Sequence, residues 1–170
     1  MSIKGLFDAL GVGNVGFRMD EVMSGWHEFE PGQGPEGQLP FEFRVTWGPR
    51  RLGPWLTPGS GEFLTQELSG TLSAGGLCMD ASCQGTLELR YFTDHRLRYD
   101  FSFNVNGRDY LFVGEKVNIQ IWNLPVSHTT CFGVVKEADS GRLVSRSVTH
   151  FHLHRAPKFL STFRLTRERG

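Results

Sequence analysis

Three histidines alternate along one predicted strand near the C-terminal end of the sequence: His150, His152 and His154. Alternate residues of a strand share a face and lie roughly 7 Å apart, so two neighbouring imidazoles can bind one Zn²⁺. The third lies too far along to join them without a bulge, although His128 on another strand could complete the site. We favour a plain exposed strand face over this metal centre, because metal ligands must meet in three dimensions. We therefore predict no metal, no cofactor and no catalytic residue.

The three cysteines do not form a motif with clear chemistry. Cys78 and Cys83 are spaced C-x4-C, but no second pair accompanies them, so a structural zinc site is not indicated. Cys131 follows His128 by three residues, which places the two on opposite faces of a strand and not as a nucleophile with its base. We expect Cys131 to be a small buried hydrophobic residue.

Several classes of partner are disfavoured by composition and context. The glycines at 11, 13 and 16 spell GxGxxG, but a predicted helix precedes them and a strand follows, the reverse of a dinucleotide site. Lys plus Arg equals Asp plus Glu at 18 each, so there is no basic excess for nucleic acid. We see no apolar run long enough for a signal peptide or a membrane span. An odd number of cysteines favours a reduced, cytoplasmic protein.

Apolar and polar residues alternate along two neighbouring predicted strands, 86–92 and 96–106. The linker 93–95 predicts a hairpin, and Asn106-Gly107 is typical of a type I′ turn leading to a third strand at 109–113. A register slip of one residue would bury Arg98 and Asp100, so the apolar set must face inward. This inward stripe contains Leu87, Leu89, Tyr91, Leu97, Tyr99, Phe101 and Phe103.

The remaining pattern indicates an all-β fold. We predict further strands at 22–29, 41–47, 63–73, 127–136, 142–154 and 159–166. About nine or ten strands joined mostly by local hairpins favour an antiparallel up-and-down meander that closes into a barrel. One short helix is expected within residues 1–14, from the helical spacing of Ile3, Leu6, Phe7 and Leu10. The Gly- and Pro-rich segments 31–40 and 48–61 are expected to be loops within a single domain spanning residues 1–170.

Short segments spread from residue 22 onwards carry a resemblance to a known family. They are Met23-Ser24-Gly25, Leu68-Ser69-Gly70-Thr71-Leu72, Gly85-Thr86-Leu87, Leu97-Arg98-Tyr99-Asp100-Phe101, Asn106-Gly107, Gly114-Glu115-Lys116 and Phe159-Leu160-Ser161-Thr162-Phe163-Arg164. With them the chain resembles the accessory region of bacterial glucose–methanol–choline oxidoreductases of the cholesterol oxidase-like kind. The resemblance places flavin and oxidation chemistry in a separate domain that this sequence lacks, so no catalytic residue is carried over. It implies a stand-alone barrel of calycin- or lipocalin-like shape that partners an oxidoreductase or binds an apolar molecule.

The sequence leaves three functions open. The leading one is a non-enzymatic β-barrel that binds a lipid- or sterol-like molecule between the inward stripe and Trp55 of the loop 48–61. A barrel of more than eight strands would leave room for such a ligand. The alternatives are a metal-dependent enzyme using His128, His150 and His152, and an interaction module that docks on an oxidoreductase.

Overall fold

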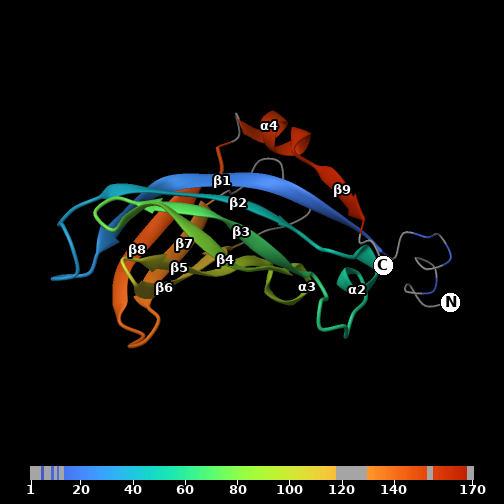
Figure 1. The fold of residues 1–170 in the computed structure, drawn as a ribbon, viewed down its shortest axis with the longest axis horizontal. Helices are drawn as coiled ribbons and strands as arrows, with labels where there is room; N and C mark the ends of the chain where they lie inside the picture. Colours follow the sequence, from blue (N-terminus) through green and yellow to red (C-terminus); the bar gives the residue numbers. More distant parts are fainter. Residues whose placement is uncertain are drawn as a thin grey trace.

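Eight antiparallel strands close into a barrel in which each strand pairs with its neighbour in the chain and β8 pairs back with β1 (Figure 1). The computed structural model describes residues 14–117, 130–152 and 155–167, together with Gly5, Ala9 and Gly11. The barrel strands are β1 (Val15–Phe29), β2 (Leu39–Gly48), β3 (Thr65–Ala74), β4 (Cys78–Arg90), β5 (Arg96–Val105), β6 (Arg108–Lys116), β7 (Thr130–Glu137) and β8 (Leu143–His150). The expected all-β meander is confirmed, but eight strands close it and not nine or ten.

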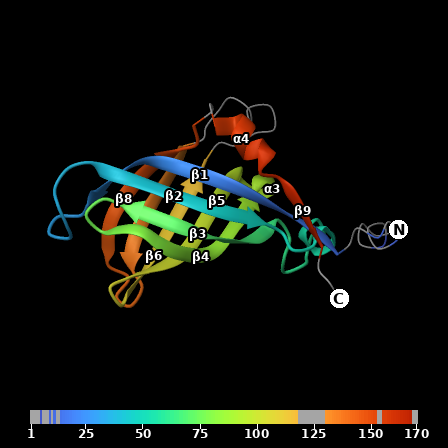
Figure 2. The same ribbon diagram turned by 45° about the horizontal axis from the view of Figure 1, so that its top comes forward.

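The ninth strand, β9 (Arg164–Arg167), lies outside the barrel. It pairs with the first four residues of β1, which extend past the point where β1 joins β2 (Figure 2). The predicted strand at 159–166 is wrong over its first part, because α4 (Ala156–Ser161) occupies it. Pro157 lies in the first turn of α4, where a missing N–H costs no hydrogen bond and the proline ring favours the helical φ.

The strands are strongly staggered around the barrel. The path of cross-strand partners leads from Phe29 through Ser145, Val135, Phe112, Phe101, Gly85, Leu68 and Trp47 to Met19. The path starts at Phe29 and returns to the same strand, β1, at Met19, which is ten residues away. Such a stagger tilts the strands, and in a barrel of eight strands side chains can fill the interior.

Aromatic side chains fill the middle of the barrel. Tyr99, Phe101 and Phe103 of β5 are only 1–3% exposed. The ring of Phe101 stacks on that of Phe112 with centroids 4.7 Å apart, and Phe43 packs against Phe101 at 5.6 Å. The predicted pairing of this strand with both of its neighbours is confirmed, and so are the positive φ angles of the Asn106-Gly107 turn, at 51° and 81°.

The two ends of the barrel differ. Short turns, such as the one between β5 and β6, lie at one end, and α2 (Leu52–Trp55) and α3 (Tyr91–Asp94) lie at the other, which we call the loop end (Figure 1). The predicted linker 93–95 is corrected, because β4 stops at Arg90 and a helical turn follows. An ion pair between Arg90 and Asp94, at 2.9 Å, links the start and the end of that turn, and the left-handed backbone of His95 ends it.

Three other predicted strands are observed, but their ends differ from the predicted ones. The predicted strand 142–154 ends at His150 in the structure, and β3 begins at Thr65, two residues later than expected. The predicted strand 127–136 is observed as β7 from Thr130. Most of the expected N-terminal helix, together with His128, Leu153 and His154, lies outside the described residues.

Candidate functional site

The predicted inward stripe lies in the hydrophobic core. Leu87, Tyr99, Phe101 and Phe103 are 0–3% exposed. A void large enough for a water molecule would leave accessible surface on the side chains around it. These four side chains have almost no accessible surface, so no such void adjoins them. Two further stripe residues, Leu89 and Leu97, are partly buried against this core. Tyr91 begins α3 and so leaves the strand; its side chain lies outside what the structure describes.

Trp55 lies at the loop end, close to the stripe. Its indole Nε1 donates to the Gln66 side-chain oxygen at 2.6 Å, and Gln66 is the cross-strand partner of Leu87. The Trp55 ring also meets the edge of Phe17 at 5.7 Å. The structure thus brings Trp55 close to the stripe through Gln66. The contacts that Trp55 makes there are with other protein side chains, and they do not test whether a ligand binds. Ligand binding between them stays a prediction.

A charged cluster that the sequence analysis missed lies inside the barrel near the loop end. Lys116 Nζ is 2.6 Å from Glu21 Oε1, and both residues are buried. The Tyr99 hydroxyl and the Trp47 indole donate to Glu21 Oε2 at 2.9 Å and 3.0 Å. Burial, and then the neighbouring Glu21 carboxylate, raise the pKa of Tyr99 well above its usual range, so Tyr99 stays protonated. The cluster joins β1, β2, β5 and β6.

The cysteines are not poised as nucleophiles. Cys131 has no exposed surface, and burial raises the pKa of its thiol to about 12. Burial likewise raises the pKa of Cys83 to about 11. Because the thiolate is the reactive form, these thiols are inert near neutral pH. The expectation that Cys131 is a small buried residue is confirmed.

The histidines of the predicted cluster have separate partners. His150 Nδ1 lies 2.9 Å from the Thr130 hydroxyl, and His152 Nε2 lies 2.9 Å from the Ser24 hydroxyl. Among the described residues, no group of three His, Cys, Asp or Glu side chains is placed to hold a metal ion. The other two histidines considered for this site lie outside those residues.

The outer wall of the barrel is polar over half of its circumference. Along β2 to β5 the outward positions alternate with the buried ones, as expected for a sheet that faces water on one side. These outward residues include Arg44, Thr46, Glu67, Ser69, Gln84, Thr86, Arg98, Asp100 and Ser102.

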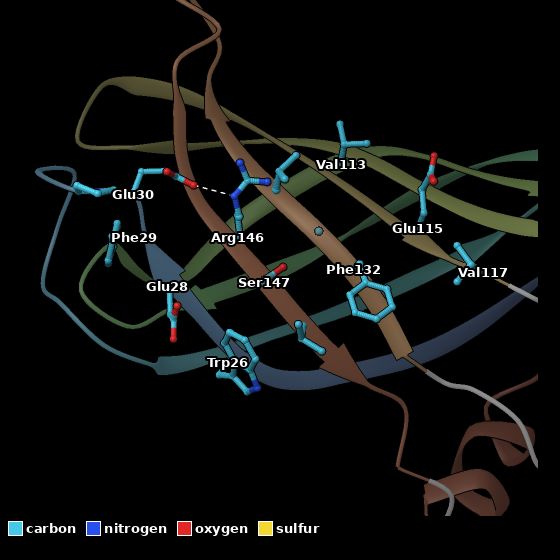
Figure 3. A pocket seen from close by; sticks show the side chains of 14 residues that line it. Trp26, Glu28, Phe29, Glu30, Val113, Glu115, Val117, Phe132, Arg146 and Ser147 are labelled. Atoms are coloured by element: carbon cyan, nitrogen blue, oxygen red, sulfur yellow. Dashed lines mark hydrogen bonds and ion pairs between the residues drawn. The ribbon is translucent and has the colours of Figure 1, made fainter.

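The other half carries a cluster that we call the outer apolar face. It consists of Trp26 on β1, Val113 on β6, Phe132 and Val134 on β7, and Val148 on β8. Trp26 and Phe132 are both cross-strand partners of Val148, and Val134 is the partner of Val113. These side chains line a groove of about 850 Å³ (Figure 3). Phe132 is 54% exposed, so the face offers apolar surface to solvent.

Charged groups border the outer apolar face on two sides. Arg146 Nε donates to Glu30 at 2.8 Å beside one end of the groove (Figure 3). At the other end Glu115 accepts from Arg96 at 3.0 Å. An apolar floor between charged borders is the usual anatomy of a binding surface.

One sequence signal could have revealed this face. Residues 111–113 and 134–135 are consecutive apolar residues, whereas a strand with one wet side should alternate. The alternation of residues 96–104 indicates only the inner side of the barrel, so it does not predict the outer apolar face.

Two further findings bear on identity. Among the described residues, no helix combines the length and the apolar character needed to cross a membrane. Comparison with protein-family models, curated proteins and solved structures finds no match, so nothing links the chain to glucose–methanol–choline oxidoreductases or calycins.

Proposed function

We propose that this chain is a non-enzymatic binding barrel that takes a hydrophobic molecule in the groove of its outer apolar face. The observation that carries the proposal is the concentration of five apolar, outward side chains on four neighbouring strands. Continuous exposed apolar surface bordered by polar groups marks binding sites more often than it occurs by chance.

The size of the groove favours a small molecule. Ligand pockets usually enclose roughly 300–1,000 Å³, and this groove measures about 850 Å³. Its walls stand on paired strands, so little ordering of the protein opposes binding. Covering the apolar floor would contribute roughly 25 cal/mol per Å² of buried apolar surface.

The inner stripe is less suited to the ligand than the outer groove. A molecule between Phe101 and the strands opposite would have to displace rings that already pack at 4.7–5.6 Å. The outer groove needs no such displacement. No observation on the described residues favours docking on an oxidoreductase or metal-dependent catalysis.

Titration with the neutral fluorescent dye N-phenyl-1-naphthylamine tests the proposal. The variant Phe132→Ser removes the exposed aromatic ring of the groove, and we expect its affinity for the dye to fall at least about tenfold. Met79→Ser is the matched control, because Met79 is 85% exposed on β4 and lies outside the groove. The control should bind the dye like the parent chain.

Two outcomes would overturn the proposal. One is a parent chain that binds neither the dye nor a neutral sterol at micromolar concentrations. The other is binding that survives Phe132→Ser but is lost in Trp55→Phe, which would place the ligand at the loop end and inside the barrel.

A further inference from the structure

A second hollow lies between α4 and the outer wall of β1 and β2, and we call it the α4 cleft. Its volume is about 500 Å³. Val22 and Phe151 supply apolar surface, and Arg44, Arg155 and Lys158 supply positive charge. The segment around α4 is tied to β1, because the Asp20 N–H donates to Thr162 Oγ1 at 2.9 Å and Ser24 bonds His152. The cleft is therefore built by fixed elements.

The acidic side chains beside the cleft are already engaged. The carboxylate of Asp20 accepts from Thr46 at 2.7 Å and from Arg164 at 3.1 and 3.3 Å. These bonds lower the pKa of Asp20 against the effect of partial burial. Glu21 turns its carboxylate into the barrel toward Lys116. Neither acid is left to neutralise Arg155 or Lys158, and Arg44 already pairs with Glu42.

Arg155 and Lys158 differ from Arg44, the third basic residue of the cleft, and from most other described arginines. Among the described residues, ten arginines form ion pairs with acidic side chains: Arg44, Arg50, Arg51, Arg90, Arg96, Arg98, Arg108, Arg142, Arg146 and Arg164. Arg155 and Lys158 have no acidic partner in the part of the chain that the structure describes, although Arg155 is half-buried. A chain with no net charge thus gathers unneutralised positive charge beside an apolar floor.

We propose that the α4 cleft binds an anionic amphiphile, with its carboxylate or phosphate group at Arg155 and Lys158 and its apolar chain on Val22 and Phe151. Charge-assisted hydrogen bonds to a carboxylate or phosphate are the strong contacts that such cations make. The α4 cleft shares no lining residue with the groove of the outer apolar face, so this proposal does not depend on the proposed function. The amphiphile is a free molecule and not a lipid of a membrane, because the cleft is enclosed by α4 on one side.

Calorimetric titration of the full chain with decanoate, decyl phosphate, decanol and inorganic phosphate tests this site. We expect decanoate and decyl phosphate to bind the parent chain at least about tenfold more tightly than the double variant R155Q/K158Q. The matched control R50Q/R51Q removes two charges that are paired on the surface with Glu67 and Glu62, and it should bind like the parent chain. Raising the salt concentration should weaken binding to the parent chain and leave binding to the double variant little changed.

The arms of the experiment separate the sources of binding. Phe132→Ser should keep the preference for decanoate over decanol, because that preference comes from the α4 cleft and not from the outer apolar face. Equal affinity of the parent chain and R155Q/K158Q for decanoate would overturn the proposal. Binding only to vesicles of phosphatidylglycerol, with no binding of free decanoate or decyl phosphate, would overturn it as well.

Discussion

Replacing one partner of the buried ion pair between Glu21 and Lys116 should destabilise the fold more than replacing both. Their side chains are only 6% and 9% exposed, and the charged atoms lie 2.6 Å apart. At an effective dielectric constant of about 20 the attraction amounts to roughly 6 kcal/mol. Taking each ion out of water costs several kcal/mol, so the two effects nearly cancel. The pair contributes little net stability, whereas either partner alone would be a buried, uncompensated charge.

Three variants measure this coupling. Lys116→Met leaves the Glu21 carboxylate with its Tyr99 and Trp47 donors but no cation, and Glu21→Gln leaves the ammonium group without an anion. Each should lower the free energy of unfolding by about 3–5 kcal/mol, and the double variant should lower it by less than either single one. Urea unfolding at pH 7 measures the free energy of unfolding of each of the three variants, provided that the m-value is unchanged. A double variant whose loss equals the sum of the two single losses would refute the reasoning.

Three further predictions rest on single residues. Gly133→Ala should destabilise the fold by about 1–3 kcal/mol, because a Cβ there would lie 2.4 Å from the Phe112 ring; Gly61→Ala, with open space around it, should be neutral in the same urea unfolding. Burial lowers the pKa of His27 below its ordinary 6.5, so the folded chain binds a proton less readily than the unfolded one. Stability should therefore be full above pH 6.5 and fall as the pH drops below it, and His27→Gln should flatten that decline in unfolding curves from pH 8 to 5. Cys131, with a thiol pKa of about 12, should resist iodoacetamide at pH 8 in the folded chain and react after unfolding, as mass spectrometry of the peptide would show.

The barrel was largely predictable because its signals are local. The alternation of residues 96–104 sets one face inward, and Asn106-Gly107 specifies the turn that follows. The number of strands that close the barrel was not predictable from such local signals. Residues 164–166 end a predicted strand, but no local pattern shows that β9 pairs with the extension of β1 outside the closed sheet. That difference matters, because the smaller barrel is filled by its own side chains.

The buried ion pair, the helix α4 and the outer apolar face were harder to predict from local sequence patterns. Glu21 and Lys116 are 95 residues apart, and no spacing rule connects two charges that meet across a barrel. The predicted strand at 159–166 is wrong over α4, because Phe159 favours strands whereas Pro157 favours a helix start. Phe132 and Val148 lie on adjacent strands, and their shared face depends on a register that only pairing determines.

The most direct test of the central claim is a map of where a hydrophobic molecule contacts the chain. Backbone amide chemical shifts, recorded while N-phenyl-1-naphthylamine is added, give that map residue by residue. We predict that the largest changes fall on Trp26, Val113, Phe132, Val134 and Val148. Changes confined to Leu87, Tyr99, Phe101 and the indole of Trp55, with the outer apolar face unmoved, would contradict the account.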